Sequence, residues 1–411
     1  MKPTVLVFAT SPWISSAKLA MALANSGWTV MALCASPHPL RAVRAVARTH
    51  TYHFLRPIRS ISNAITRSRP DLIIPADDLA VFNLHNLYTR ACHDGKDGEN
   101  ICTLIERSLG APASFSISYK RADLMTVAAA EGIRVPETSV VSTTEALHDR
   151  ISEWGLPVFL KADNTSGGSG VKIISKVESA NPTFCALQAP PGLIRAIKRI
   201  LINGETALLW PALLRERYIL NAQVYVEGRE VTSTIACWQG KVIGSLQFEV
   251  IHRQFPLGPA TVFRAVENSE ITAVGEKLAG RLQLSGLHGF DFILSNQNGA
   301  AFLLEMNPRA TQVGHLTLGP GRDLPAALYA AFTGQSIQPS PPLTENDTIA
   351  IFPHEWIRNP ASKFLESAYH DVPWNEPALV LAGIRERRKH NVWLTRQKWI
   401  EVFSLSRGAR P

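Results

Sequence analysis

Lys161 and the glycines that follow it form the first of three groups of residues in this sequence that could act on a phosphorylated ligand. Lys161 lies near the end of an apolar segment and precedes Gly167, Gly168 and Gly170. Glycine lets backbone N–H groups approach phosphate oxygens without a Cβ in the way, and the lysine adds positive charge. No Gly-Lys-Ser/Thr follows the glycines, so this is not a P-loop. Taken alone, the pattern also fits a flexible hairpin turn.

The second group consists of carboxylates in two apolar segments that are joined by a turn at residues 296–299. Asp291 interrupts the first segment and Glu305 the second. With the two-residue period of a strand, Glu305, Asn307 and Arg309 point to the same face. Buried carboxylates are costly without a partner, so two of them with an amide oxygen favour a hard cation such as Mg²⁺. Arg309 could neutralise phosphate charge, whereas the alternative is a charged edge strand with a surface Asp–Arg pair.

The third group surrounds a glycine between two further apolar segments. Gln223, Val224 and Val226 precede Gly228, and Glu230 begins the next segment. The backbone of such a strand could present a carbonyl and an N–H to an adenine edge, and the acid could accept hydrogen bonds from ribose hydroxyls. By itself this segment is only a hairpin pattern.

The strands and helices that must position these groups follow two different patterns along the chain. The first third of the chain alternates short apolar strands with helices, which predicts a parallel sheet with crossover helices. Its first turn lacks the G-x-G-x-x-G of dinucleotide-binding domains. Beyond a helix near 120–131, longer strands cluster and predict an α+β arrangement. The strands expected are 4–10, 29–35, 71–77, 156–163, 170–175, 218–227, 230–239, 241–251, 289–295 and 300–306, and the other helices are near 15–26, 58–69, 193–202 and 271–284.

In this order and at these spacings, the three groups resemble the ATP-grasp superfamily, which includes D-alanine–D-alanine ligase, biotin carboxylase and the carbamoyl phosphate synthetase large chain. The resemblance covers about residues 1–335 and includes the segments DLIIPADD and SYKRADLMTVAAAEGIRVPET. It implies a preATP-grasp, Rossmann-like parallel-sheet domain followed by a two-lobed ATP-grasp fold. The expected divisions are a preATP-grasp domain at 1–115, an N-terminal lobe with the glycine-rich loop at 116–217, a C-terminal lobe with the metal site at 218–335, and a linker with a basic C-terminal extension at 336–411.

The resemblance also implies roles for single residues. The nucleotide-binding residues are expected to be Lys120, Lys161, Ser166, Gly167, Gly168, Gly170, Gln223, Val224, Val226 and Glu230, the metal ligands Asp291, Glu305 and Asn307, and the catalytic residues Arg309 and Lys161. The sequence departs from the family pattern at two places. Gln223 replaces the glutamate of many members, and the glycine loop is shorter than that of biotin carboxylase. The chain after residue 335 matches no member of the family.

The function implied is an ATP- and Mg²⁺-dependent ligase, with Mn²⁺ as a substitute metal, that joins a carboxylate to an amine or a thiol. It would proceed through an acyl phosphate and release ADP and phosphate. The alternatives are a phosphotransferase with a phosphohistidine at His315 or His288, and a nucleotide-binding module without ligase activity. The partners expected are a small-molecule carboxylate and an amine, and the resemblance leaves a homodimer open. Candidate substrate contacts are His252, Arg253, Gln254 and His315.

Composition indicates a globular protein of two or three domains, with 411 residues, 45% of them hydrophobic and 18% charged. The formal charge is +8, and basic residues crowd the end of the chain from Arg385 onwards. A solvated basic face is the favoured interpretation, so nucleic acid is not an expected partner. Five scattered cysteines without C-x-x-C spacing favour a reducing cytoplasm. The absence of an apolar run of 18 residues predicts no membrane span, and the N-terminal segment is interpreted as a strand and a helix rather than a signal peptide.

Overall fold

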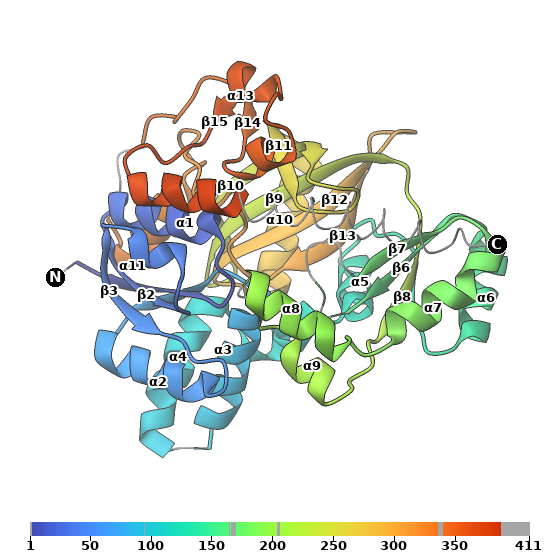
Figure 1. Ribbon diagram of the computed structural model, residues 1–411, viewed down its shortest axis with the longest axis horizontal. Helices are drawn as coiled ribbons and strands as arrows, with labels where there is room; N and C mark the ends of the chain where they lie inside the picture. The colour runs from blue at the N-terminus through green and yellow to red at the C-terminus, as the bar shows by residue number, and fades with distance from the viewer. Residues whose placement is uncertain are drawn as a thin grey trace, which may run out of the picture.

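The computed structural model describes residues 2–93, 95–163, 165, 170–203, 206–335 and 340–387, with only the backbone described for 96, 97 and 201–203. Ser166, Gly167 and Gly168 of the predicted glycine loop, and the basic tail from residue 388 onwards, lie outside the described residues. Figure 1 shows the first domain in blue on the left, a small sheet in green on the right and a large sheet in yellow and orange between them. The predicted combination of a parallel α/β layer and a following α+β region is confirmed.

The first domain contains a parallel four-stranded sheet in the order β3-β2-β1-β4. Its elements are β1 Thr4–Ala9, α1 Ile14–Asn25, β2 Thr29–Cys34, β3 Val46–Thr51, α2 Pro57–Ser68, β4 Leu72–Pro75, α3 Asp78–Ala91 and α4 Gly95–Leu109. The side chain of Asp77 caps α3 and also accepts hydrogen bonds from the backbone N–H groups of Thr10 and Ser11 at 2.6 and 3.0 Å. This carboxylate therefore joins the ends of β4 and β1. Sequence analysis missed β3 because this edge strand carries no alternating apolar pattern.

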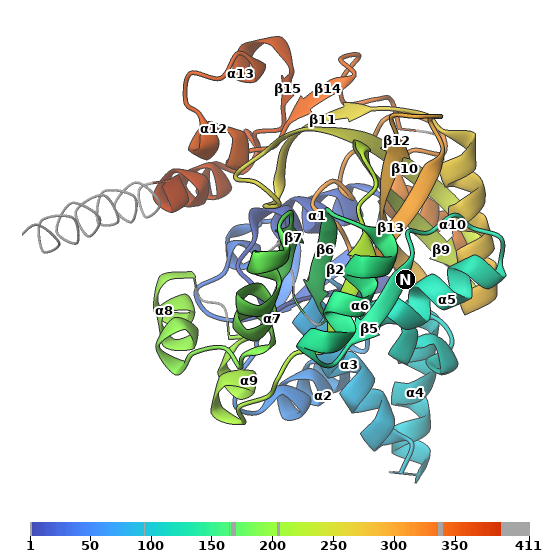
Figure 2. The same cartoon turned by 90° about the vertical axis from the view of Figure 1, so that its right-hand side faces the viewer.

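The small sheet is antiparallel, in the order β5-β8-β6-β7, and has a core of its own. Its elements are β5 Thr138–Val141, α6 Thr144–Trp154, β6 Val158–Ala162, β7 Val171–Ile174, α7 Ala180–Gln188, α8 Leu193–Asn203, α9 Leu209–Leu213 and β8 Leu220–Val224. Figure 2 shows α6 and α7 in front of this sheet. Leu147 from α6 and Phe184 from α7 bury the sheet residues Leu160 and Ala222. The small sheet therefore has a hydrophobic core distinct from those of the large sheet.

The large sheet has seven strands in the order β13-β12-β9-β10-β11-β14-β15. Its elements, with the helices that flank it, are α5 Arg121–Ala130, β9 Gly228–Trp238, β10 Lys241–Arg253, β11 Ala260–Ala265, α10 Ser269–Leu282, β12 Gly286–Ser295, β13 Ala301–Asn307 and α11 Leu324–Thr333. Phe248 on one face packs in a core with Val5 of the first domain and Leu328 of α11. Phe290 on the other face packs in a core with residues of α5 and α10. The large sheet and the first domain are thus built around a shared core.

The described part of the C-terminal region also joins the large sheet. It contains β14 Thr348–Ala350, α12 His354–Arg358, α13 Phe364–Ser367 and β15 Tyr369–His370. Strand β14 pairs with β11, and just beyond β15 the carboxylate of Asp371 lies 2.7 Å from the amine of Lys18 in α1. Both side chains are buried, so this ion pair fixes the C-terminal segment to the first domain. Within the described residues, none of the helices has the length and apolar character needed to cross a membrane.

Candidate active site

The hairpin of β12 and β13 brings the three predicted metal ligands together. Asp291 lies directly opposite Glu305, and the turn between the strands is where the sequence predicted it. The amide nitrogen of Asn307 donates to a carboxylate oxygen of Asp291 at 3.1 Å. In the described part of the chain, no group of three or more His, Cys, Asp or Glu side chains is arranged to hold a metal ion. Two carboxylates and an amide suit Mg²⁺, which ordinarily completes its shell with water and phosphate oxygens.

Arg121 is the principal site residue that sequence analysis missed. Its guanidinium donates to Glu305 at 3.0 Å and to the carbonyl of Ala162 at 2.6 Å, and it lies 3.5 Å from the carboxylate of Asp163. Arg121 is the first residue of α5 and thereby connects the large sheet to the end of β6 in the small sheet. The same helix face carries Leu124 and Ala128, both buried, and this i, i+3, i+7 spacing is the signal that could have identified Arg121.

Lys120, the residue predicted for this role, is not brought to the cluster. Its side chain is 56% exposed and forms a surface ion pair with Asp123 at 3.5 Å. As the N-cap residue of α5, Lys120 has extended backbone angles rather than helical ones. Adjacent basic residues at a helix start therefore point in different directions, and the structure directs Arg121 inward.

Lys161 is buried in β6, next to these charges. Its amine lies 5.3 Å from the centre of the Phe159 ring. Burial lowers the pKa of Lys161 to about 8, even though Glu305 acts in the opposite direction. Burial raises the pKa of Glu305, but Arg121 and Lys161 outweigh it and hold that pKa below its ordinary value. Burial and then the neighbouring Glu305 raise the pKa of Asp291. In this cluster the cations of Arg121 and Lys161 therefore lie near the carboxylates of Asp291 and Glu305.

Arg309 joins this cluster to the first domain. Its Nε donates to Asp78 at 2.8 Å, and one of its terminal nitrogens donates to the side-chain oxygen of Asn307 at 3.2 Å. The guanidinium also lies 6.0 Å from the centre of the Trp13 ring. Asp78 follows β4 and Trp13 follows β1, so Arg309 faces the loops at the carboxyl ends of the parallel strands. Open α/β sheets commonly bind ligands at that edge.

The residues predicted to contact adenine lie at the junction of the two sheets. Gln223 is buried in β8 and donates to the hydroxyl of Thr138 at 2.9 Å, while its amide oxygen has no hydrogen-bond partner among the described residues. The N–H of Val224 donates to the carbonyl of Glu137 at 2.9 Å. Val226 lies in the connection between β8 and β9. Because those strands belong to different sheets, this segment links two sheets instead of forming a hairpin.

Glu230 and Gly170 flank this junction. Arg253, one of the candidate substrate contacts, donates to Glu230 at 2.7 Å. Burial lowers the pKa of Lys161, and the charge of Glu230 acts against that lowering. Gly170 is buried, and its carbonyl accepts from the N–H of Ala162 at 2.8 Å. A Cβ at Gly170 would lie 2.0 Å from the hydroxyl oxygen of Thr165, so a larger residue would not fit there. The described end of the glycine loop is therefore closely packed against β6.

The sequence matches no protein-family model, and the comparison with curated proteins finds no match. Solved structures are similar in fold. The biotin carboxylase domain of 2-oxoglutarate carboxylase from Hydrogenobacter thermophilus, in complex with MgADP, ADP and bicarbonate, has a TM-score of 0.57 at 16% identity over 83% of this chain and 72% of that one. Biotin carboxylase from Campylobacter jejuni, in a β,γ-ATP complex, has a TM-score of 0.59 at 12% identity over 82% and 72%.

A third similar structure is N5-carboxyaminoimidazole synthase from Aspergillus clavatus with ADP and 5-aminoimidazole ribonucleotide. Its TM-score is 0.59 at 13% identity, over 82% of this chain and 79% of that one. This chain has the ATP-grasp fold. At these identities the likeness establishes the architecture, and the activity has to be argued from the site itself.

Proposed function

We propose that this protein is an ATP- and Mg²⁺-dependent ligase that activates a carboxylate as an acyl phosphate for attack by an amine or a thiol. The observation that carries the proposal is the convergence of Arg121, Lys161, Asp291, Glu305 and Arg309 where the three sheets meet. Three cations and two carboxylates in partly buried surroundings match the combined charges of a polyphosphate and a divalent cation. ATP-bound and ADP-bound enzymes of the same fold support this assignment.

In this proposal the nucleotide lies between the small and the large sheet. Lys161 and Arg121 bind its phosphates, the backbone at Val224 and Val226 meets the adenine, and Glu230 accepts the ribose hydroxyls. Asp291, Glu305 and Asn307 would hold Mg²⁺, which neutralises phosphate charge when it is bound. The side chain of Lys120 is exposed and pairs with Asp123 at 3.5 Å, so this proposal gives the inward-facing role to Arg121.

The reaction proposed for this site has two steps. A carboxylate oxygen of the substrate attacks the γ-phosphorus, and the bond from that phosphorus to the departing ADP oxygen breaks. The nucleophile then attacks the carbonyl carbon of the acyl phosphate, loses its proton and expels inorganic phosphate. Arg309 faces Trp13, in the loop after β1, and Asp78, at the start of α3, so we assign it to orienting the carboxylate and the phosphoryl group. Closure of the small sheet over the site would exclude water, which would otherwise hydrolyse the acyl phosphate.

The phosphotransferase alternative receives little support from the two candidate histidines. His315 is buried and its Nε2 lies 3.0 Å from the carboxylate of Asp371. His288 is also buried, and its Nε2 bonds to the carbonyl of Ser285 at 2.8 Å. A phosphohistidine needs an imidazole nitrogen that is open to the γ-phosphate, and in both residues the ring is buried and Nε2 already bonds to a protein oxygen.

The decisive experiment measures release of ADP and phosphate from Mg-ATP in the presence of pools of amino acids, thiols and small carboxylic acids. Lys161→Ala and Glu305→Ala test the site, and Lys241→Ala, a change at an exposed lysine on the large sheet, is the matched control. We expect release that requires both an acid and a nucleophile, that is lost in the two site variants and that is retained in the control. Transfer of phosphate to an acceptor without release of free phosphate would instead establish a phosphotransferase. Absence of Mg²⁺-dependent ATP binding would refute the proposal.

A further inference from the structure

The first seventy residues of the chain have an unusual charge distribution. They contain nine lysines and arginines and no aspartate or glutamate, and the first acidic residue is Asp71. The whole chain has a formal charge of +8, so this segment alone carries a larger excess than the complete protein. The basic C-terminal tail is therefore not the main source of the positive charge.

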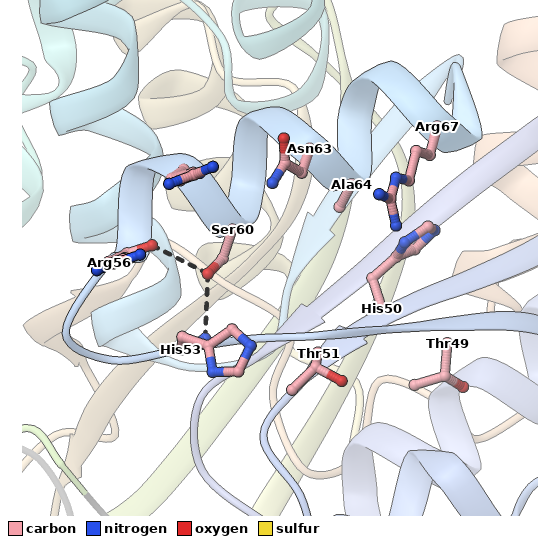
Figure 3. A pocket seen from close by; sticks show the side chains of 10 residues that line it. Thr49, His50, Thr51, His53, Arg56, Ser60, Asn63, Ala64 and Arg67 are labelled. Atoms are coloured by element: carbon pink, nitrogen blue, oxygen red, sulfur yellow. Dashed lines mark hydrogen bonds between the residues drawn. The ribbon is translucent and has the colours of Figure 1, made fainter.

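Part of this charge surrounds a pocket between the edge strand β3 and helix α2 (Figure 3). The pocket has a volume of about 360 Å³, and it is lined by Arg56, Arg59, Arg67, His50, His53 and Asn63 together with threonine and serine hydroxyls. Arg56 and His53 lie at one end of the helix, and Arg67 and His50 lie at the other. No acidic side chain contributes to the lining. The pocket thus has basic groups at both ends and neutral polar groups between them.

The protein itself does not neutralise these arginines. Elsewhere in the first domain, Lys18 pairs with Asp371 and Arg44 pairs with Glu376. In contrast, Arg56, Arg59 and Arg67 form no ion pair within the part of the chain that the structure describes. Like charges held together without a counter-ion repel one another, and a bound anion would relieve that repulsion.

The other polar groups of the pocket show which atoms remain for a ligand. The hydroxyl of Ser60 is turned inward, because it donates to the carbonyl of Arg56 at 2.9 Å and accepts from the N–H of His53 at 3.1 Å. The Nε2 of His50 bonds to the hydroxyl of Ser68 at 2.7 Å. Burial, and then the charges of Arg48 and Arg67, lower the pKa of His50. The amide of Asn63 and the guanidinium groups of the three arginines line the pocket, and they can donate to a ligand.

We propose that this pocket binds a small molecule with two separated phosphoryl groups, at a site distinct from the one for ATP. Guanidinium groups bind phosphate in a bidentate manner, and two clusters at opposite ends of α2 match two anionic groups on one ligand. Strands β3 and β4 form opposite edges of the sheet, and three strand spacings separate them by roughly 14 Å. Helix α3, which follows β4, begins at Asp78, and Asp78 contacts Arg309, so the pocket lies across the sheet from the candidate active site.

The lining favours a small molecule over a single-stranded nucleic acid. Proteins that bind single strands combine a basic groove with aromatic side chains on which the bases stack. The pocket contains no tryptophan, tyrosine or phenylalanine among its lining residues. Its donors are therefore suited to phosphoryl groups rather than to bases.

The test is calorimetric titration of the full-length protein with fructose 1,6-bisphosphate, a stable probe that carries two separated phosphoryl groups. Saturating Mg-ADP is present so that the nucleotide site does not bind the probe. The site variant is Arg56→Gln/Arg59→Gln/Arg67→Gln. The matched control removes the same charge from exposed positions elsewhere, as Arg90→Gln/Arg217→Gln/Lys241→Gln.

We expect the site variant to bind the bisphosphate at least about tenfold more weakly than the unmodified protein, and the control to change by less than about twofold. Affinity for Mg-ADP should be equal in all three proteins, because the pocket and the nucleotide site are separate. Inorganic phosphate and citrate serve as further probes. Weaker binding of inorganic phosphate supports two subsites, whereas citrate binding equal to that of the bisphosphate would overturn the preference for phosphoryl groups.

Two further results would overturn the proposal. Equal losses in the site variant and in the control would show that the bisphosphate responds to overall charge and not to this pocket. Tighter binding of a twelve-nucleotide single strand, lost only in the site variant, would make the pocket part of a nucleic-acid surface. Circular dichroism of each variant verifies that the loss of binding is not a loss of folding.

Discussion

Replacing Arg121 with methionine removes the guanidinium that connects the large sheet to the small sheet, and keeps a flexible side chain of comparable length. Arg121 is 12% exposed, and it bonds to Glu305 at 3.0 Å and to the carbonyl of Ala162 at 2.6 Å. Breaking a fully buried ion pair by removing one partner costs about 3–5 kcal/mol. The side chain of Glu305 retains 32% exposure, so water compensates it in part. We therefore expect the free energy of unfolding to fall by roughly 2–3 kcal/mol.

The same substitution should weaken nucleotide binding. A hydrogen bond to a charged group is worth about 1.5–3 kcal/mol, which corresponds to a loss of about ten- to a hundredfold in the affinity for Mg-ATP. Urea denaturation without ligand gives the stability change, and calorimetric titration gives the affinity. Lys120→Met is the matched control, because Lys120 is the adjacent residue and carries the same charge in an exposed position. An exposed ion pair contributes about 0–1 kcal/mol, so this control should change little.

A double variant separates the loss of a partner from a general effect on the fold. In Arg121→Met/Glu305→Gln the carboxylate left alone by the first change is neutral, so much of the lost stability should return. The reasoning is refuted if Lys120→Met weakens Mg-ATP binding as much as Arg121→Met does, because the structure assigns the interaction to Arg121. It also fails if the two changes in the double variant are simply additive.

Three further predictions concern other parts of the molecule. The pKa of Lys161 is about 8 in the ligand-free protein, and phosphate binding needs the protonated amine. The affinity for Mg-ATP should therefore fall about fivefold between pH 8 and pH 9, and titration of Lys161→Arg should show no such slope. Lys18→Met should lower the free energy of unfolding by about 3–5 kcal/mol in urea, because it leaves the carboxylate of Asp371 buried without its cation. Lys18 and His315 hold the pKa of Asp371 below its ordinary value in spite of burial. The stabilisation from this ion pair should therefore be present above about pH 4 and be lost as the pH falls further. Acid unfolding at equilibrium measures this loss. Gly228→Ala should destabilise the protein by more than about 1 kcal/mol, because a Cβ there would lie 2.2 Å from a backbone oxygen on β12; an unchanged midpoint of thermal unfolding would contradict this.

Local periodicity and turn chemistry determined much of this protein from sequence alone. Two apolar segments around a turn at residues 296–299 predicted a pair of strands that carry Asp291 and Glu305, and the strand pairing confirms this hairpin. Alternation of short apolar strands and helices likewise predicted the parallel sheet of the first domain. The patterns that predict these elements are contained in windows of about 11–18 residues, which the sequence records directly.

Tertiary structure alone decided which charges meet. The pair formed by Arg309 and Asp78 joins residues 231 positions apart, and the pair formed by Arg121 and Glu305 joins residues 184 positions apart. No periodic pattern specifies such pairs, because a charged residue has the same sequence signature whether it faces solvent or a distant partner. The choice between Lys120 and Arg121 follows from how α5 packs on the large sheet, and the basic pocket beside β3 follows from the polar edge of the first sheet. The sequence supplied the chemical groups, and packing between distant segments selected which of them share a site.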